Sequence, residues 1–369
     1  MSLTYSTAGE SHGPGLMAMI EGLPAGLPLD LDAIRAGLAR RWQGYGRGPR
    51  SKFEQDKLSC YSGLKNGVTL GTPLVLLIEN SDSRIDELPN LAAPRPGHVD
   101  LAGVQRLQCR DIRAVLERAS ARETAARTAL GEVARQLLSH FNVDVESQVL
   151  SVAGISYEDT GAWQSRVDEA KAAGDSLGGR FQVRANGVIP GLGSYSQANQ
   201  RLDAKLMAAI SSIPAIKAVS MGSGFDADLT PGSEYHDPII SDPRAWGGVS
   251  RSSNNAGGVE GGLSNGQQVV VEAIIKPIPT LRKGLPSIDL SDMTATRSTY
   301  ERSDICVVEA AAVVGEALVA LELASVLCDR LSQVTLSEMK KVFSDLSKNS
   351  DMYTWPNDIS ALECPTQID

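Results

Sequence analysis

The sequence predicts one domain of the α/β (α+β) class, in which helices and sheets are mixed along the chain. Its 369 residues are 42% hydrophobic, which is enough to supply a full core. Segments whose apolar residues recur with helical spacing are interspersed with segments that alternate apolar and polar residues. Neither a repeat of fixed period nor a Pro- or Ser-rich linker divides the chain, so we expect a single domain.

The first half of the chain predicts helices separated by loops and a buried strand. Asp30 stands where it can cap an amphipathic helix over 31–42, whose last turn contains two arginines. A Gly/Arg-rich loop follows, and the short apolar run at 71–80 predicts a buried strand. Two prolines oppose helix at 91–100, so we expect a loop there. An alanine-rich stretch predicts one helix over 118–141 that packs closely against its neighbours.

The second half predicts short helices and strands that precede one long apolar helix. A glycine-rich loop is expected over 254–267, and the long helix is expected from about residue 304. The tail after residue 340 is polar, and we expect an appendage that is partly disordered. The other predicted elements are helices at 163–173 and 201–213 and strands at 180–189 and 267–276.

Charge and composition exclude several classes of protein. The net charge is −9 and the pI is near 5.1, so we expect no nucleic-acid partner. Five scattered cysteines without a C-x-x-C pair indicate reduced thiols in a cytoplasmic protein, with no metal site and no disulfide framework. No secretory signal is visible near the first residue. The apolar segment 305–327 carries three glutamates, which favours a buried helix over a membrane span.

Two clusters of arginines predict a substrate with several negative charges. For any single arginine, a solvated helix face is the simpler interpretation. Here, however, three glycines at 44, 46 and 48 let backbone N–H groups approach an anion, and guanidinium groups pair bidentately with phosphate or carboxylate. Neither a Walker motif nor a dinucleotide-binding fingerprint accounts for them. The clusters are Arg40, Arg41, Arg47 and Arg50, and Arg110, Arg113, Arg118 and Arg122.

His12 and His98 are the candidate proton-transfer groups among the four histidines of the chain. Each stands next to a glycine in a predicted turn, where backbone segments approach closely and functional groups concentrate. Histidine exchanges protons near neutral pH, which suits general acid–base catalysis. His140 lies among apolar residues late in a predicted helix and is expected to be structural, whereas His236 is expected to be a solvated loop residue.

The pentapeptide at 9–13 has the G-x-S-x-G spacing of a serine-hydrolase nucleophile elbow around Ser11. Such an elbow needs an oxyanion N–H group from an earlier strand–helix loop. Only ten residues precede Ser11, which leaves no room for that loop. Serine hydrolysis is therefore the weak alternative, and His12 is the favoured working residue of this segment.

Several segments resemble the chorismate synthase family, in the order in which that family carries them. The resemblance extends from residue 1 to about 335, so we expect a catalytic domain over 1–335 and a polar C-terminal tail over 336–369. The segments are AGESHGPGL near the N-terminus, RRWQGYGRG at 40–48, RPGHVD at 95–100, RDIRAVLERASARET at 110–124, NNAGGVEGGLSNGQ at 254–267, IKPIPT at 275–280 and ERSDICVVEAAAVVGEAL at 301–318.

The resemblance implies a fold, a reaction and a cofactor. The fold would be a β-α-β sandwich with helices packed between antiparallel sheets, assembled as a homotetramer. The reaction would be the 1,4-anti elimination of phosphate from 5-enolpyruvylshikimate 3-phosphate, which gives chorismate. It needs reduced FMN although it has no net redox change. NADPH is a further cofactor of some members, and because no flavin-reductase domain is recognisable, an external flavin reductase is the expected source of the reduced flavin.

The resemblance also implies roles for individual residues. His12 matches the histidine that manages the protonation of the flavin, His98 matches the one near the leaving phosphate, and Asp304 matches an aspartate that helps to relay a proton. Substrate-binding residues would be Ser11, Arg41, Arg47, Arg113 and Arg122. Cofactor-binding residues would be Arg41, Arg47, Arg118, Ala119, Ser120, Ala215, Gly261, Lys276, Pro277, Ile278, Pro279, Thr280 and Arg302.

Three departures from the family pattern concern the flavin. Ala119 replaces a common serine, and Pro214 stands where an asparagine is frequent. The segment at 254–258 also lacks a basic residue that many members have. We expect these changes to alter flavin affinity without abolishing activity. The alternative function is a non-catalytic binder of flavin or of a phosphorylated metabolite, which would need the arginines but not His12, His98 and Asp304 together.

Overall fold

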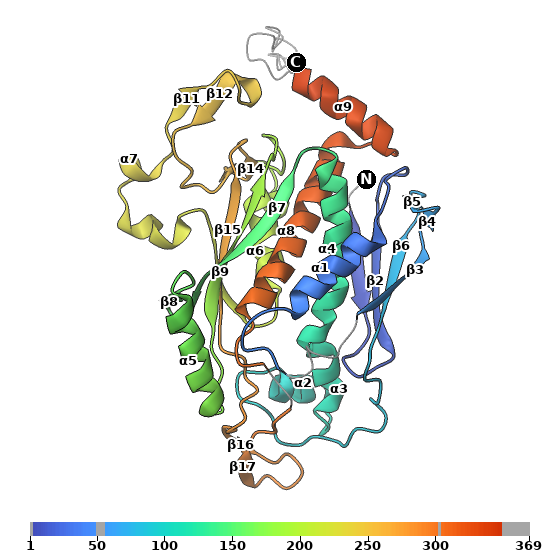
Figure 1. Cartoon of the computed structure of the whole chain (residues 1–369), viewed down its shortest axis with the longest axis vertical. Helices are drawn as coiled ribbons and strands as arrows, with labels where there is room; N and C mark the ends of the chain where they lie inside the picture. The colour runs from blue at the N-terminus through green and yellow to red at the C-terminus, as the bar shows by residue number, and fades with distance from the viewer. Residues whose placement is uncertain (1–2, 49–55, 302–303, 349–369) are drawn as a thin grey trace, which may run out of the picture.

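The computed structural model, which describes residues 3–48, 56–301 and 304–348, is a layer of helices between two antiparallel sheets (Figure 1). One sheet has the strand order β1-β2-β6-β3 and the other has the order β10-β15-β9-β7-β8. Every strand pairing within both sheets is antiparallel. The predicted β-α-β sandwich is therefore confirmed.

Strands β2, β6 and β9 alternate in burial, because one face of each sheet packs against the helices. The first sheet contains β1 (Thr4–Ala8), β2 (Gly15–Glu21), β3 (Lys57–Ser62) and β6 (Leu74–Glu79). The second contains β7 (Asp144–Val152), β8 (Ile155–Ser156), β9 (Gly179–Asn186), β10 (Ile216–Met221) and β15 (Val269–Ile275).

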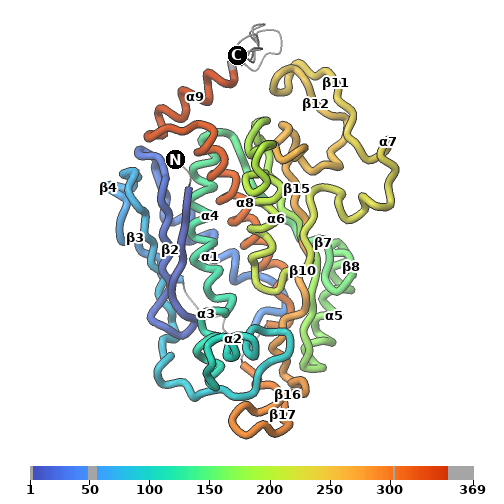
Figure 2. The backbone as a smooth tube through the Cα atoms, turned by 180° about the vertical axis from the view of Figure 1, so that it is seen from behind, coloured from blue at the N-terminus to red at the C-terminus, as the bar shows by residue number. Residues whose placement is uncertain are grey.

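Four helices fill the space between the sheets, and the view from behind shows one sheet on each side of them (Figure 2). They are α1 (Leu31–Trp42), α4 (Thr124–Ser139), α6 (Leu202–Ser211) and α8 (Val308–Leu331). Smaller helices are α2 (Asp100–Leu107), α3 (Arg113–Ala119), α5 (Thr160–Ala172), α7 (Gly232–Tyr235) and α9 (Leu336–Lys348). Short hairpins are β4 (Leu64–Lys65) with β5 (Val68–Thr69), β11 (Ile239–Ser241) with β12 (Val249–Arg251), β13 (Val259–Glu260) with β14 (Leu263–Ser264), and β16 (Pro286–Ile288) with β17 (Ala295–Arg297).

Small residues set the distance between the two central helices. A Cβ atom added to Gly131 of α4 would lie only 2.3 Å from Cβ of Ala317 in α8. Gly315 of α8 packs equally closely against the second sheet, since a Cβ atom there would lie 2.8 Å from the ring of Phe181 in β9. The close packing predicted for the alanine-rich helix is thus present, and it leaves α4 and α8 in direct backbone contact.

The single helix predicted over 118–141 is wrong, because the chain breaks at Ser120. Ser120 is extended (φ −62°, ψ 142°), and its hydroxyl accepts a hydrogen bond from the backbone N–H of Arg122. Such N-terminal capping by serine favours a new helix start over continuation of the old one. The break separates α3 from a 3₁₀ turn at Ala121–Glu123, which runs directly into α4.

Other element boundaries differ by a few residues from the sequence predictions. The long helix starts at Val308 and not near residue 304, so Asp304 lies in the segment that precedes it. The glycine-rich segment 254–267 contains the hairpin β13–β14. Helix α8 is long and apolar enough to cross a membrane by length and composition, but 94% of its apolar window is buried. It is the core helix that the three glutamates predicted.

The beginning of the predicted polar tail forms helix α9, which packs on the core. Leu336 and Met339 are 5% and 1% exposed. The ring of Phe343 lies 5.2 Å from that of Phe141, centroid to centroid. The overall composition of this segment is polar and did not predict the contact, because a short amphipathic helix needs only one apolar stripe to pack on a core. Residues 349–369 lie outside the described part of the chain.

Candidate active site

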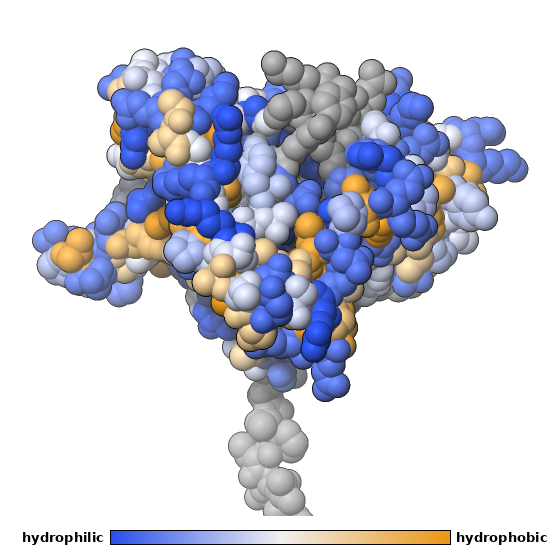
Figure 3. All heavy atoms as spheres, turned by 90° about the horizontal axis from the view of Figure 1, so that it is seen from below, coloured by the Kyte–Doolittle hydropathy of each residue, from blue (hydrophilic) through white to orange (hydrophobic). Residues whose placement is uncertain are grey.

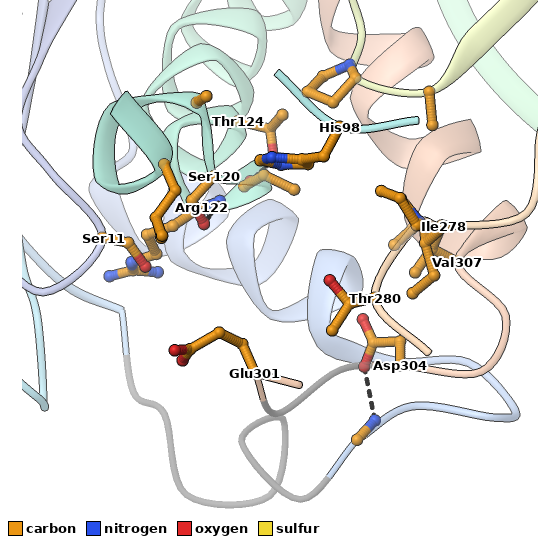
Figure 4. A pocket seen from close by; sticks show the side chains of 18 of the residues that line it. Ser11, His98, Ser120, Arg122, Thr124, Ile278, Thr280, Glu301, Asp304 and Val307 are labelled. Atoms are coloured by element: carbon orange, nitrogen blue, oxygen red, sulfur yellow. Dashed lines mark hydrogen bonds between the residues drawn. The ribbon is translucent and has the colours of Figure 1, made fainter. Parts of the chain in front are cut away.

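A cavity of about 660 Å³ lies at the end of the helix layer that is near α2 and α3. This volume is within the usual range of small-molecule sites. Its walls come from the turn after β1, the end of α1, the α3–α4 junction, the segment after β15 and the start of α8. In the close view, Ser11 and Arg122 lie on one side, while Ile278 and Asp304 lie on the other (Figure 4). Seen from this end, the surface of the molecule is mostly hydrophilic (Figure 3).

His12 is held by a buried carboxylate. Its Nδ1 lies 2.8 Å from Oε2 of Glu117, and its backbone N–H donates to the same oxygen over 3.2 Å. The Glu117 side chain is 2% exposed, and Arg113 contacts its other oxygen at 3.0 Å. Burial alone raises the pKa of Glu117, but hydrogen bonds and charge from His12 and Arg113 outweigh burial and lower the pKa below its ordinary value.

His98 is held in the same way by Asp100, the first residue of α2. Its Nδ1 is hydrogen-bonded to Oδ1 of Asp100. Arg95 binds both oxygens of this carboxylate, through Nε at 2.7 Å and Nη2 at 3.0 Å. Burial opposes ionisation of Asp100, yet hydrogen bonds from His98 and Arg95 hold its pKa well below the usual range. A carboxylate fixed in its charged form accepts the hydrogen bond from Nδ1 and so orients the ring next to it.

The cavity is rich in cations although the protein is acidic. Its walls carry six arginine or lysine side chains and three carboxylates. Arg41 is the most enclosed of the arginines: burial lowers its pKa to about 10, so it stays charged at neutral pH. The cations are Arg41, Arg47, Arg84, Arg95, Arg122 and Lys276, and the acids are Asp82, Glu301 and Asp304.

All six of these cations already contact partners inside the protein, as Arg95 does with Asp100, Arg84 with Asp82 and Lys276 with the carbonyl of Gly97. Arg47 pairs with Asp304 at 2.8 Å, and the backbone N–H of Gly48 donates to the same carboxylate over 2.5 Å. Arg122 pairs with Asp56, and its Nε also donates to Asn80. Arg41 donates to Thr124 and to two backbone carbonyls, and its guanidinium lies 4.6 Å from the ring centroid of Trp42. The guanidinium groups are therefore fixed in place before any ligand binds.

The structure brings most of the predicted site residues together around this cavity. The three candidate catalytic residues, which are far apart in sequence, all line it. Pro214 and Ala119, two of the three departures from the family pattern, also line it. The predicted residues on its walls are Ser11, His12, Arg41, Arg47, His98, Ala119, Ser120, Arg122, Ala215, Lys276, Ile278, Pro279, Thr280 and Asp304.

Four predicted residues stand outside the cavity wall, and one lies outside the described residues. Arg113 is buried behind the wall between Glu117 and Glu301. Arg118 is exposed and donates to the backbone oxygens of Thr7 in β1 and of Gly9 just after it. Gly261 lies at the exposed turn of the β13–β14 hairpin, and Pro277 separates two lining residues without lining the cavity itself. The remaining prediction concerns Arg302, which is not among the described residues.

Sequence reasoning missed the partners of the two histidines. Glu117 lies 105 positions from His12, and no spacing rule links them. Asp100 stands two residues after His98, within the segment quoted for the resemblance, so a search for a carboxylate near each candidate histidine would have found it. Within the described residues, no group of three or more His, Cys, Asp or Glu side chains is arranged to hold a metal ion.

An excess of fixed cations and two carboxylate-held histidines around one cavity define an enzyme site for a small polyanion. Comparison with known proteins identifies the kind of enzyme. Residues 3–328 match the family model described as chorismate synthase. The chain belongs to the chorismate synthase family and is an enzyme of the lyase class.

The relatives match along nearly their whole length. Chorismate synthase of Thermoanaerobacter pseudethanolicus is 47% identical over 342 residues, which cover 92% of this chain and 97% of the relative. That of Geobacter sulfurreducens is 43% identical over 380 aligned positions, with the same two coverages. A crystal structure titled as chorismate synthase superposes with a TM-score of 0.79 at 36% identity, covering 95% of this chain and 98% of the other.

Proposed function

We propose that the cavity is where this member of the chorismate synthase family eliminates phosphate from 5-enolpyruvylshikimate 3-phosphate to give chorismate, beside bound reduced FMN. The observation that carries this proposal is the meeting of His12, His98 and Asp304 with six cationic side chains around one cavity. The substrate carries two carboxylates and one phosphate, and such a polyanion is complementary to those cations.

The residues present fit a flavin. The lining of the cavity includes apolar side chains that suit a flat ring system, among them Ile213, Ile275, Val307, Ala311 and Val314. Nearby backbone at Ser120 and Ala215 and the side chain of Lys276 offer polar contacts for the flavin edge and phosphate. Ala215 has a φ of +71°, an uncommon conformation for a residue with a side chain. When bound, reduced FMN supplies electron density to the substrate.

The two histidines handle protons at defined nitrogen atoms. A carboxylate only accepts hydrogen bonds, so Nδ1 of each ring carries the hydrogen that faces Glu117 or Asp100. Nε2 of each ring is then the nitrogen that exchanges protons with a bound molecule. We assign His98 to the proton of the departing phosphate and His12 to the protonation state of the flavin. We assign Asp304 to the relay of the proton taken up by the flavin, while Arg47 holds the carboxylate of Asp304 in place.

Several finer properties belong to the same proposal. Arg41 and Arg47 are the residues proposed to contact NADPH if the protein uses it, and an external flavin reductase is the proposed source of reduced FMN otherwise. We also propose a cytoplasmic homotetramer. The location is supported by the buried position of α8, which packs inside the protein. The tetramer is what the resemblance to the family implies.

The experiment that tests the proposal is an anaerobic assay with purified protein, chemically reduced FMN and 5-enolpyruvylshikimate 3-phosphate. We expect stoichiometric release of phosphate and formation of chorismate. Binding of both molecules without phosphate release would overturn the proposal and support the non-catalytic binder. The same assay in air with NADPH and oxidised FMN then separates self-reduction from dependence on an external reductase.

A further inference from the structure

We propose that Glu117 is the residue that positions His12 for proton transfer, and that Arg113 holds Glu117 instead of binding substrate. Glu117 would fix the ring of His12 in a single tautomer, with the hydrogen on Nδ1 and with Nε2 available to a bound molecule. This inference rests on the proposed function, because it assigns a partner to one of the proton-transfer groups named there.

Glu117 is attached to the turn that carries His12 by three hydrogen bonds. Its Oε2 accepts from Nδ1 of His12 at 2.8 Å and from the His12 backbone N–H at 3.2 Å. Its backbone carbonyl accepts from the N–H of Ser11 at 2.9 Å. One residue of α3 therefore fixes both the backbone of the turn and the direction of the imidazole ring. A side chain held at ring and backbone together has little freedom to rotate.

The chemistry of the contact determines the tautomer. Glu117 is 2% exposed, and its lowered pKa keeps it ionised at neutral pH, so it accepts hydrogen bonds and cannot donate them. Nδ1 of His12 must then carry the hydrogen in both the neutral and the charged ring. His12 itself is 19% exposed and lines the cavity, so its Nε2 is the nitrogen that reaches a ligand.

Arg113 is fully engaged behind the cavity wall. Its Nη1 lies 3.0 Å from Glu117, its Nη2 lies 3.3 Å from Glu301, and its Nε donates to the carbonyl of Pro89. The residue is 8% exposed and is absent from the cavity lining. A guanidinium in this position neutralises the buried carboxylate and fixes its second oxygen. In this proposal Arg113 acts on Glu117, whereas the resemblance implied that it binds a substrate anion.

The arrangement occurs twice in the same cavity. Asp100 likewise binds Nδ1 of His98 on one oxygen and an arginine, Arg95, on both. An ion pair that only stabilises the fold does not need a histidine. Here the two histidines that are hydrogen-bonded to carboxylates are the two that line the cavity. A carboxylate that is hydrogen-bonded to one ring nitrogen orients a functional imidazole and fixes its tautomer. The other charged groups on the cavity walls are Arg41, Arg47, Arg84, Arg122, Lys276, Asp82, Glu301 and Asp304.

The test observes the tautomer directly, in protein labelled with ¹⁵N-histidine. The chain has only four histidines, so its ring nitrogen signals can be resolved and assigned with a His12→Asn variant. We expect the neutral His12 ring of the wild type to carry its hydrogen on Nδ1. In Glu117→Gln, whose amide can donate as well as accept, we expect a shift toward the Nε2–H form. Glu301→Gln, which leaves Glu117 in place, is the matched control and should keep the wild-type tautomer.

Turnover provides the second readout. Glu117→Gln should lower kcat about 10- to 100-fold, the usual effect of losing such an outer partner, with KM changed by less than about threefold. Glu117→Asp keeps the carboxylate and should recover part of the loss. An Nε2–H ring in the wild type, or an unchanged tautomer in Glu117→Gln, would refute the positioning role. A changed tautomer with unchanged kcat would refute its importance for catalysis. An inactive wild type with the expected tautomer would instead refute the proposed function.

Discussion

Replacing Gly131 by alanine should destabilise the protein through one contact between helices. A Cβ atom at this position would lie 2.3 Å from Cβ, 2.4 Å from Cα and 2.6 Å from the carbonyl oxygen of Ala317. Ordinary apolar contacts are about 4 Å, so α4 and α8 would have to separate by more than 1 Å. Two of the three contacted atoms belong to backbone, so no side-chain rotation relieves the overlap.

The expected magnitude follows from two opposing effects. Overpacking of a filled core costs about 1–3 kcal/mol, and a backbone clash lies at the upper end of that range. Alanine is a better helix former than glycine by about 1 kcal/mol, which offsets part of the cost. We therefore expect Gly131→Ala to lose about 2 kcal/mol of unfolding free energy. We also expect weaker FMN binding, because Ala310, Ala311 and Val314 of α8 line the cavity.

The assay is urea denaturation followed by circular dichroism, with flavin fluorescence titration on the same samples. Gly161→Ala is the matched control: it also lies in a helix, α5, but a Cβ atom there has no neighbour within 4 Å among the described residues. We expect that variant to be neutral or slightly stabilised. If Gly131→Ala is as stable as Gly161→Ala, the direct packing of α4 on α8 is not what limits this position, and the reasoning fails.

Three further predictions concern single side chains. Asp100→Asn should lower kcat about 10- to 100-fold while FMN affinity stays within about threefold, because the variant removes the carboxylate that holds the ring of His98 and leaves the apolar lining residues unchanged; a large loss of FMN affinity in the titration would contradict this. Burial raises the pKa of Glu322, so the wild type loses stability as the pH rises through the ordinary glutamate range toward that raised value. Glu322→Gln should therefore be more stable than the wild type in urea at pH 7.5 and equal to it at pH 4, and equal stability at both pH values would exclude this effect. Arg118→Ala should weaken FMN binding by less than about threefold, since Arg118 anchors Thr7 outside the cavity wall; a tenfold or larger loss would restore its predicted role as a flavin contact.

The sequence predicted elements whose signal is local. The capped helix over 31–42 is present over Leu31–Trp42, with Asp30 accepting hydrogen bonds from the N–H groups of the first turn. The strand expected at 71–80 is present as Leu74–Glu79. Both depend on a cap or an apolar run within about ten residues, and such patterns survive folding because packing reinforces them.

The sequence did not predict features that depend on distant partners. The alanine-rich stretch favours helix throughout, so nothing but the capping hydroxyl of Ser120 marks the break before α4. The contacts of Arg113 were missed for a related reason: its charge indicates an anionic partner, but only the fold shows that it pairs with Glu117. The joint placement of His12, His98 and Asp304 came from the resemblance, since no local pattern brings them together.

The internal ion pairs around the cavity also bear on which ligands the site can select. Arg47 holds Asp304, Arg95 holds Asp100 and Arg122 holds Asp56, so the site contains its own counterions. A small monovalent ion must compete with these carboxylates one at a time and gains little. A molecule that presents three anionic groups in a fixed geometry engages several guanidinium groups at once, at an effective concentration that simple salts cannot match. We therefore expect the resident carboxylates to make the site bind ligands with several anionic groups in preference to the ions of ordinary salts.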